Sequence, residues 1–417
     1  MRIIVWGVNY HPEQVGIAPY NTALCEHLTR EGHDVEMVST FAYYPMWKKA
    51  PEDEGKLFAS ETINGVRVHR CWHFVPGRPS GLRRIFHEAS FVFTSMLRAL
   101  ALPRADVMVV VSPPLLLGAA AWLVGRVKRM PHVLHIQDLQ PDAAVGLGML
   151  DWEWFIAILR ALELFSYRNA ARVSVISEGM LQALKRRGVQ RLVHFPNWIA
   201  TKDTDAPAGE FRAAHGIAPD EFLLLYSGNI GVKQGLELIV EAASRVKGMR
   251  LVICGDGAAR PGLQDLIASS GSRNVTLLPL QAEGDYARMM VDADVCVISQ
   301  RSGTGAAFFP SKLLSCVAFG KPVLAVADRE SELARMVRDE DLGMVVEHWD
   351  VAEVAAVMRG LAASRAKLAR WGENGRNLAD QFAEEMVLRN FEQVLSGVVA
   401  PRAPRLIAVE PEVVKKV

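Results

Sequence analysis

Short β-branched segments alternate with helix-length amphipathic segments along nearly the whole chain, and this alternation limits the possible folds more than any other feature. The first series of predicted strands comprises residues 2–8, 34–40, 107–112, 133–137, 173–177 and 192–195. From Phe222 the pattern restarts, with the predicted strands LLLYS, RLVIC, VTLLP, VCVIS and PVLAV. Strands separated by helices form right-handed βαβ units and a parallel sheet. The sequence therefore predicts an α/β protein of two doubly wound, Rossmann-like domains.

Length and composition fit this organisation. The chain has 417 residues, of which 50% are hydrophobic and 22% are charged, enough for two cores. The polar, proline-bearing stretch 201–210 is the predicted linker, so we expect domains at 1–200 and 201–380 and a loosely ordered tail over 399–417. The formal net charge of +1 argues against a nucleic-acid partner.

Cysteine usage and hydropathy predict a cytoplasmic protein. The five cysteines are far apart and show no metal-ligand spacing, which is typical of reduced core residues. The N-terminal residues enter a strand directly and do not resemble a signal peptide. The most apolar stretch, 107–124, is interrupted by Ser112-Pro113-Pro114 and reads as strand, turn and helix rather than a membrane span.

A glycine-rich loop opens the second domain. The apolar strand before it is followed by Gly228, Gly231 and Gly235, with Lys233 among them, and then by the helical stretch LELIVEAASRV. Bare N–H groups at a helix N-terminus favour an anion, and glycine lets that anion approach the backbone. The loop is therefore a candidate phosphate site. Gly16, in the loop before the first helix, fits the same interpretation or an ordinary turn.

Two further positions carry candidate site residues. Asp138 follows the predicted strand VLHIQ, and carboxyl ends of parallel strands border the ligand site in such sheets. His135 lies within that strand and is interpreted as a core histidine. In Pro310-Ser311-Lys312, Ser311 can cap a helix, whereas Lys312 opposes the helix dipole unless an anion lies nearby. Arg301, just after the strand VCVIS, is a weaker candidate of the same type.

The sequence implies no metal. Two Asp-x-Asp triplets are present, at Asp203–Asp205 in the linker and Asp292–Asp294 before a strand. Neither follows the carboxyl end of a strand with further oxygen ligands, so both are interpreted as structural.

Residues 82–102 form an apolar, basic segment with two open interpretations. Arg83, Arg84 and Arg98 flank Phe86, Phe91 and Phe93. An interfacial membrane helix has this composition, and so does a half-buried helix whose arginines extend outward. The first interpretation predicts peripheral association with an anionic membrane surface.

Assembled in order, the motifs resemble those of family 4 of the retaining glycosyltransferases. Within it they are most similar to bacterial exopolysaccharide enzymes of the colanic-acid and fucosamine-transferase type. The matching segments run to about residue 398 and comprise Gly16-Ile17, the DLQPD around Asp138, Ser177-Glu178, Pro196-Asn197-Trp198, Gly228-Asn229-Ile230-Gly231, Gln234-Gly235, Gly255-Asp256-Gly257, Leu278-Pro279-Leu280-Gln281, Pro310-Ser311-Lys312 and Gly320-Lys321-Pro322-Val323.

This resemblance implies a GT-B fold, with two domains facing a cleft and a last long helix, at 381–398, returning to the first domain. It implies a nucleotide-sugar donor held by the second domain, an acceptor held by the first, and retention at the anomeric carbon without metal or other cofactor. Asp138 is then the candidate catalytic residue. The candidate donor-binding residues are Gly16, Asn229, Gly231, Lys233, Gln234, Leu280, Gln281, Arg301, Ser311 and Lys312.

Three positions depart from the family pattern. Gln137 stands where many relatives have a histidine, and Gln234 stands where a basic residue is common before the last glycine. Ser315 replaces the acidic residue that many members place on the donor ribose. The last change implies that ribose recognition is weaker, water-mediated or supplied by other groups.

Three functions compete at this point. The preferred one is a glycosyltransferase at the inner face of a bacterial membrane, moving a hexose-type sugar from a nucleoside-diphosphate donor to a lipid-linked or oligosaccharide acceptor. The second is a nucleotide-sugar epimerase of the same fold. The third is a non-catalytic, nucleotide-sugar-binding subunit of a polysaccharide assembly complex, which Gln137 and Ser315 motivate.

Overall fold

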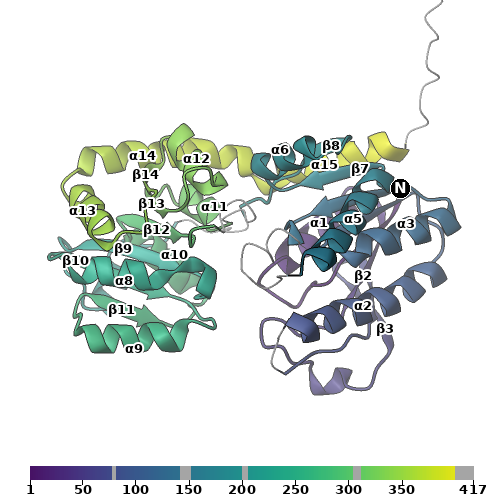
Figure 1. The fold of residues 1–417 in the computed structure, drawn as a ribbon, viewed down its shortest axis with the longest axis horizontal. Coiled ribbons are helices and arrows are strands. Elements are labelled where there is room, and N and C mark those ends of the chain that lie inside the picture. Colours follow the sequence, from purple (N-terminus) through teal and green to yellow (C-terminus); the bar gives the residue numbers. More distant parts are fainter. Residues whose placement is uncertain (78–80, 141–151, 200–204, 304–310, 400–417) are drawn as a thin grey trace, which may run out of the picture.

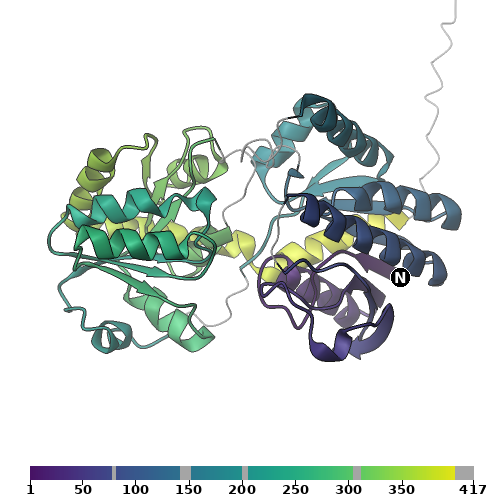
Figure 2. The same cartoon turned by 60° about the horizontal axis from the view of Figure 1, so that its bottom comes forward.

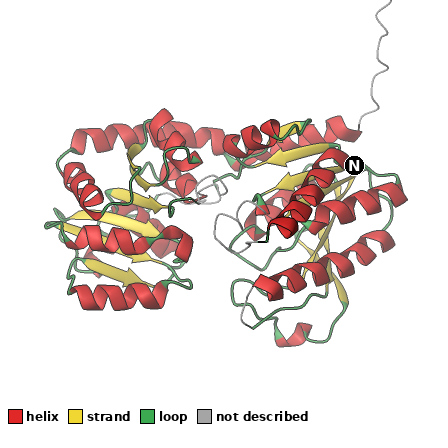
Figure 3. Cartoon of the chain, viewed as in Figure 1, coloured by secondary structure: helices red, strands yellow, loops and turns green. Residues whose placement is uncertain are grey.

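The structure is a computed structural model that describes residues 1–77, 81–140, 152–199, 205–303 and 311–399. Two α/β domains lie side by side, and the described chain passes back from the second to the first near its C-terminal end (Figure 1). In each domain the strands form a central sheet with helices on both faces (Figure 3). The predicted pair of doubly wound domains is therefore confirmed.

The first sheet has the order β3-β4-β2-β1-β5-β6-β7-β8 in the described residues. All neighbours are parallel except β3 and β4. The strands are β1 (Arg2–Trp6), β2 (Asp34–Thr40), β3 (Phe58–Ile63), β4 (Val66–Cys71), β5 (Val107–Ser112), β6 (His132–Ile136), β7 (Arg172–Val175) and β8 (Leu192–His194). The helices that cover them are α1 (Ala18–Arg30), α2 (Gly81–Ala101), α3 (Leu116–Lys128), α5 (Glu153–Asn169), α6 (Glu178–Arg186) and α15 (Glu384–Val399), with a 3-10 turn η1 (Pro51–Asp53).

The antiparallel pair β3–β4 was missed by the sequence analysis. Its two-residue turn is Asn64-Gly65, with φ angles of 49° and 84°. Both angles are positive, as a primed hairpin turn requires, and Asn-Gly is the strongest short signal for that turn. The flanking runs ASETI and VRVHR were therefore identifiable as a hairpin.

The second sheet has the order β11-β10-β9-β12-β13-β14, and all its pairs are parallel. Its strands are β9 (Phe222–Ser227), β10 (Met249–Cys254), β11 (Val275–Leu278), β12 (Val295–Ser299), β13 (Val323–Val326) and β14 (Gly343–Val346). The short β14 was also missed. The surrounding helices are α7 (Glu210–Ala214), η2 (Val232–Gln234), α8 (Leu236–Ser244), α9 (Arg260–Ser270), α10 (Glu283–Asp292), α11 (Ser311–Ala318), α12 (Glu332–Asp339), α13 (Val351–Ala362), α14 (Arg365–Ala379) and η3 (Asp380–Phe382).

Each sheet separates two apolar layers. In the first domain, α2, α3, α5 and α6 pack on one face, while α1 and α15 pack on the other. Right-handed crossovers explain this division, because β1 connects to β2 in one direction along the sheet and β4, β5 and β6 connect onward in the opposite direction. The predicted segment 82–102 is thus a real helix, α2, with one face in the core.

The last helix returns to the first domain, as the resemblance implied. Figure 2 shows it, in yellow, extending from the second domain into the first. Its Phe391 stacks on Phe195 with ring centroids 3.8 Å apart, and Val387, Leu388 and Leu395 are buried beside it. Before this helix, the Ile199 N–H donates to the Phe382 carbonyl at 3.0 Å. A second bond between the domains joins the Gly179 N–H to the Glu332 carboxylate at 2.8 Å.

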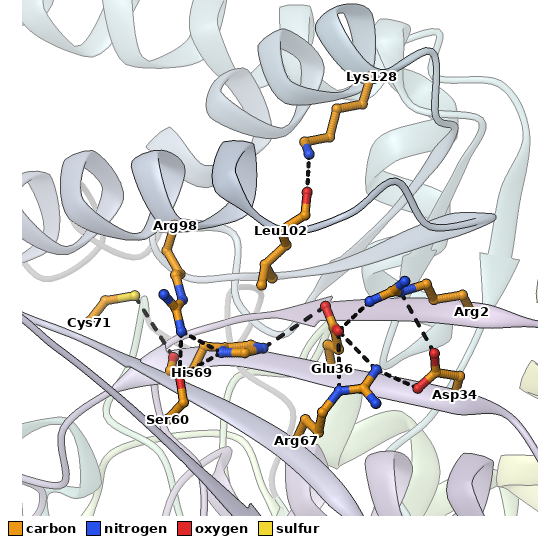
Figure 4. Close-up of polar contacts among 10 residues, drawn as sticks. All are labelled: Arg2, Asp34, Glu36, Ser60, Arg67, His69, Cys71, Arg98, Leu102 and Lys128. Carbon is orange, nitrogen blue, oxygen red and sulfur yellow. Dashed lines mark hydrogen bonds and ion pairs between the residues drawn. The ribbon is translucent and has the colours of Figure 1, made fainter.

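A charge cluster around the buried Glu36 carboxylate ties together the neighbouring strands β1, β2 and β4 of the first sheet (Figure 4). The Glu36 carboxylate accepts hydrogen bonds from Arg2 at 2.6 Å and from Arg67 at 2.9 Å. Arg67 also pairs with Asp34 at 2.6 Å. Because Arg2 and Asp34 begin strands β1 and β2, this cluster lies at the amino edge of the sheet and away from the carboxyl edge where ligands bind. We interpret it as structural.

Candidate active site

The predicted site residues come from the carboxyl ends of strands in both domains. Asp138 follows β6, the glycine loop follows β9, Leu280 and Gln281 follow β11, and Arg301 follows β12. In parallel sheets this is the ligand-binding edge. The two edges approach each other at Asp138 of the first domain and Lys233 of the second, whose charges are near enough to interact.

Asp138 is a desolvated carboxyl at this junction. It comes two residues after the last residue of the fully buried strand β6 and is only partly exposed. Burial raises the pKa of Asp138 to about 6, and the positive charge of Lys233 opposes that rise. Near neutral pH the carboxyl is therefore mostly ionised but poorly solvated, so it interacts strongly with any group brought next to it.

Gln137 belongs to a hydrogen-bond chain inside the first domain. Its amide Nε2 donates to Asn197 Oδ1 at 3.0 Å and contacts His135 Nε2 at 2.9 Å, while His135 Nδ1 lies 3.0 Å from Ser174 Oγ. Burial lowers the pKa of His135 to about 3, so the ring is neutral. Because an amide nitrogen only donates, His135 Nε2 accepts and its Nδ1 donates to Ser174.

These hydrogen bonds of Gln137 and His135 have two consequences. The interpretation of His135 as a satisfied core histidine is confirmed, since both ring nitrogens have partners. Gln137 is buried and its amide is used within the domain, where it ties β6 to the Pro196-Asn197-Trp198 segment. Sequence reasoning missed this link because the two residues are 60 positions apart.

The glycine loop differs from the predicted cradle of free N–H groups. The Gly228 N–H donates to the Cys254 carbonyl at 2.9 Å, and the Ile230 N–H donates to the Asp256 carbonyl at 2.8 Å. The Gly231 N–H donates to the buried side chain of Gln234 at 3.1 Å. These donors are already used within the domain, so the prediction that they are bare is corrected.

Close packing explains the loop glycines instead. At Gly228, where φ is 131°, a Cβ would collide with the side chain of Lys312. At Gly235, where φ is 55°, a Cβ would collide with the ring of Trp349. At Gly231 it would meet Gln234 Oε1 at 2.8 Å and Asn229 Nδ2 at 2.9 Å. The glycines therefore let bulky side chains, such as those of Lys312 and Trp349, pack directly against the loop backbone.

Lys312 is the most unusual cation of the site. Its ammonium group lies 5.2 Å from the centre of the Tyr226 ring. Burial, together with the nearby charge of Lys233, lowers the pKa of Lys312 to about 8. Among the described residues no carboxylate forms an ion pair with Lys312. A buried cation without a carboxylate is costly, and an anionic ligand would offset that cost.

Lys233 is the second cation. It lies in η2, and burial lowers its pKa, while Asp138 opposes the shift and Arg84 of the first domain adds to it. Lys233 and Lys312 therefore repel each other, and Arg84 reaches the same region from α2. Three cations from three elements converge on one place, which no single sequence motif indicated.

Other predicted donor residues lie around this centre with their own partners. The Arg301 guanidinium pairs with Glu237. The backbone N–H of Arg301 donates to the Lys233 carbonyl at 2.7 Å. Gln281 donates to the Pro279 carbonyl at 2.8 Å, and Leu280 is exposed. Asn229 is exposed beside Gly231. These residues border the site, and their contact with a donor stays a prediction.

Two predictions concern helix beginnings. Ser311 is the first residue of α11 and is exposed, so it lies inside the helix rather than at the capping position before it. The preceding residue, Pro310, lies outside the described residues. Gly16 has φ of 68° and precedes α1, and a Cβ there would meet only Tyr44, at 3.6 Å. The left-handed backbone explains the glycine, and a phosphate at Gly16 stays a prediction.

Ser315 and Lys312 line a small cavity in the second domain. The cavity has a volume of about 40 Å³, enough for a water molecule. The residues around it include Ser227, Tyr286, Cys296, Lys312, Ser315 and Cys316. Burial raises the pKa of the Tyr286 phenol, and a hydrogen bond with Ser315 opposes the rise. A hydroxyl and a phenol thus occupy the position where the family pattern has a carboxylate.

The first domain contributes an aromatic and imidazole cluster at the same edge. The buried Glu13 carboxylate accepts from the N–H groups of Tyr43 and Tyr44, both at 2.8 Å, and so joins the loops after β1 and β2. Tyr43 contacts the ring of His87 in α2 through its hydroxyl at 3.1 Å. Sequence reasoning missed Glu13 and His87, whose spacing carries no recognisable pattern.

The acidic triplets are structural where the structure describes them. Asp292 accepts from the N–H groups of Gly209 and Arg212 at 2.5 and 2.9 Å, and so caps α7. Asp294 pairs with Arg212 at 2.7 Å and accepts from the Leu223 N–H at 2.7 Å. Asp203 lies outside the described residues. Within the described ranges, no group of three or more His, Cys, Asp or Glu side chains is arranged to hold a metal.

Two family descriptions match the chain, one for each domain. "Glycosyl transferase 4-like domain" matches residues 15–198, and "Glycosyl transferases group 1" matches residues 208–378. The chain is 30% identical to the putative colanic acid biosynthesis glycosyl transferase WcaI of Escherichia coli K12, over 95% of this chain and 100% of that protein. The protein therefore belongs to the group 1 glycosyltransferases, as its motifs indicated.

Other relatives and solved structures agree with this assignment. The probable glycosyltransferase WbjE of Pseudomonas aeruginosa is 29% identical over 63% of this chain and 67% of its own length. Sucrose-phosphate synthase of Thermosynechococcus elongatus superposes with a TM-score of 0.76 at 20% identity, covering 95% of this chain and 98% of the other. Anabaena Alr3699/HepE in complex with UDP gives 0.67 at 16% identity, covering 95% and 100%. The GT-B fold is thereby established.

Of the helices in the described ranges, none combines the length and the apolar character needed to cross a membrane.

Proposed function

We propose that the protein is a retaining, metal-independent glycosyltransferase that moves a hexose-type sugar from a nucleoside-diphosphate donor to a lipid-linked or oligosaccharide acceptor. The observation that carries the proposal is the pair of desolvated lysines, Lys233 and Lys312, opposite the Asp138 carboxyl of the other domain. Two mutually repelling cations suit a diphosphate, which carries more than one negative charge. The similar Anabaena fold was solved with UDP and with UDP-glucose.

The chemistry follows from these charges. The bond between the anomeric carbon and the diphosphate oxygen breaks, and an acceptor oxygen forms a new bond to the same carbon on the same face. Negative charge grows on the departing diphosphate, and Lys233 and Lys312 stabilise it in a desolvated setting. The proton of the acceptor hydroxyl passes to an oxygen of the departing diphosphate, so that no separate base is needed.

Asp138 serves the sugar rather than the phosphates. It follows β6 in the first domain, and its carboxylate lies near enough to Lys233 of the second domain for the two charges to interact. Such a group accepts hydrogen bonds from sugar hydroxyls and fixes the reacting carbon relative to the acceptor. We assign this orienting role to Asp138, with the carboxylate also favouring positive charge on the sugar during transfer.

The biological setting follows from the relatives. The name of the E. coli protein refers to colanic acid biosynthesis, and the match to it extends over the whole of that protein. We assign this protein to bacterial surface polysaccharide biosynthesis, in the cytoplasm and at the inner face of the membrane.

Two departures from the family pattern favour a second function, a subunit that binds a nucleotide-sugar without turning it over. Ser315 and Tyr286 supply neutral groups where the family pattern has a carboxylate for the ribose. Gln137 is bonded to Asn197 and is not free to contact the donor sugar. Both changes weaken donor recognition while leaving the lysine pair in place.

A donor panel tests the proposal. Thermal shifts should be measured with UDP-, GDP-, ADP- and TDP-sugars, because a ligand that binds the folded state stabilises it by mass action. The bound donor should then be hydrolysed slowly in the absence of acceptor. Binding without any hydrolysis would support the subunit instead. If no nucleotide-sugar raises the unfolding temperature, the donor assignment fails.

A further inference from the structure

Exposed apolar side chains are concentrated on one surface of the first domain. Of the 20 large hydrophobic side chains that are exposed among the described residues, those on or next to α2, α3 and α5 number eleven: Ile85, Phe86, Phe93, Leu97, Leu116, Leu123, Val127, Trp152, Trp154, Ile158 and Phe165. The described helices of the second domain, α7 to α14, carry none. A concentration of this kind marks an interaction surface.

Helical spacing arranges these residues in stripes. Positions 86, 93 and 97 lie on one face of α2, positions 116, 123 and 127 on one face of α3, and positions 154, 158 and 165 on one face of α5. Other faces of the three helices fill the core through Phe91, Val124 and Tyr167. Helix α3 packs between α2 and α5, and α2 and α3 are seen side by side in both views (Figures 1 and 2). The three stripes therefore form one continuous apolar surface.

The charges on this surface are mostly positive. Exposed basic residues on the three helices are Arg83, Arg84, Arg126, Arg160 and Arg168. Among the described side chains of these helices, the exposed carboxylate is Glu153 alone, since Glu163 is buried and Glu88 is largely covered. The whole chain carries a formal net charge of +1, so this excess is local. Apolar stripes bordered by arginines are complementary to an anionic bilayer.

We propose that α2, α3 and α5 together dock on an anionic lipid bilayer. Trp152 and Trp154, which are 62% and 65% exposed and stacked 6.3 Å apart, anchor the start of α5 at the lipid headgroups. A second copy of the chain is a poorer partner, because it would bring like charges together. The inference rests on the proposed function in one respect: it explains how a lipid-linked acceptor reaches the site.

The direction of the helices supplies this explanation. Each of α2, α3 and α5 connects two parallel strands, so all three begin at the carboxyl edge of the sheet, where Asp138 lies. Phe86, Leu116 and Trp154 therefore lie at the end of the surface nearest the site. Arg84, also near the start of α2, is close enough to Lys233 for the two charges to interact. A bilayer on this surface would bring a lipid headgroup next to the facing sheet edges.

Vesicle flotation of the whole protein tests the proposal. The probe is vesicles of phosphatidylcholine with phosphatidylglycerol, compared with phosphatidylcholine alone, at low and high salt. Binding should require the anionic lipid and weaken with salt. Three double variants, Trp152→Ser with Trp154→Ser, Leu123→Asn with Val127→Asn, and Arg126→Glu with Arg168→Glu, should each lower the partition coefficient about tenfold or more. The control, Met344→Ser with Arg245→Glu on the second domain, should bind like the wild type.

The vesicle experiment can fail without affecting the donor assignment, and the reverse also holds. The α3 and α5 variants should keep the nucleotide-sugar thermal shift, which shows that they fold and leaves the donor assignment untouched. Equal partition of these variants and the wild type would overturn the proposal. So would a wild type that does not bind the vesicles, and dimers seen by light scattering would then assign the surface to a second copy of the chain.

Discussion

The two facing sheet edges use different chemistry. The edge of the first domain is built from side chains that hold one another in place, such as Gln137 with Asn197 and Glu13 with the backbone of Tyr43. The edge of the second domain is built from glycines that leave room for bulky or charged neighbours, such as Gly228 beneath Lys312. A fixed network suits a sugar with many hydroxyl groups, whereas a compact pair of cations suits a diphosphate.

The comparison also bears on which groups of the second domain can serve a diphosphate in the proposed function. A glycine loop before a helix suggests N–H donors, but in this protein the N–H groups of Gly228, Ile230 and Gly231 are already bonded within the domain. In the proposed function, the charge that balances a diphosphate therefore comes from Lys233 and Lys312. Five predictions test this division between the edges, from the largest expected effect to the smallest.

Asp138→Asn should lower sugar transfer most, by about a hundredfold or more, because it removes a preorganised charge from the reacting sugar. Its effect should fall on kcat rather than on the affinity for the nucleoside diphosphate, which the second domain holds. Steady-state kinetics and calorimetric titration measure the two quantities. Asp265→Asn, at an exposed position of α9, is the matched control. An equal loss of diphosphate affinity would show that the first edge also binds the phosphates.

Lys312→Ala should weaken diphosphate binding about ten- to a hundredfold, since a hydrogen bond to a charged group contributes about 1.5–3 kcal/mol. Binding of the bare nucleoside should hardly change. Stability should not fall, because the substitution removes a buried cation. Lys247→Ala, at an exposed position before β10, serves as the control. Identical titrations of Lys312→Ala and wild type would remove Lys312 from the site.

The pH dependence should follow Lys312, whose pKa is about 8 in the free protein. Diphosphate affinity should fall by several-fold as the pH rises above 8, because the free lysine loses its charge there. Bound phosphate raises the pKa again, so binding near pH 8.5 should take up a proton, detectable as a buffer-dependent enthalpy. Phosphate itself, with a second pKa of about 6, is already ionised at this pH. The absence of proton uptake would contradict the contact.

The lowered pKa of Lys312 also makes the stability of the protein depend on pH. The pKa of Lys312 is lower in the folded than in the unfolded chain, so between pH 8 and the ordinary lysine value of 10.5 the unfolded chain binds more protons. The free energy of unfolding should therefore rise with pH in this window, and Lys312→Ala should lose that rise. Denaturant titrations of the two proteins at pH 7.5 and 9.5 measure the difference.

Chelation should have the smallest effect. We expect donor binding and transfer to persist in EDTA, because the two lysines supply the charge that a metal would otherwise provide. Calorimetric titration of the nucleoside diphosphate with and without EDTA, followed by added Mn²⁺, checks this. Binding that disappears in EDTA and returns with Mn²⁺ would mean that the lysine pair is insufficient and that the donor site includes carboxylates.

Much of the fold could be predicted because it is local in sequence. The alternation of β-branched and amphipathic segments determined two doubly wound sheets, and the restart at Phe222 located the second of them. Strand β6 and the carboxylate after it were also identifiable, since the end of a parallel strand is a local feature. The Asn64-Gly65 hairpin was equally local, so missing it was an error of interpretation.

Only the tertiary structure decided how the site works. It brought Lys312 and Lys233, 79 positions apart in the chain, close enough to depress one pKa, and it placed Asp138 opposite them. It assigned the loop glycines to packing and their N–H groups to bonds within the domain. Burial, charge interaction and packing depend on distances between segments remote in sequence, whereas strand and helix periodicity depends on neighbouring residues. The sequence alone therefore determined the architecture, and the charges of the site became interpretable only once the chain was folded.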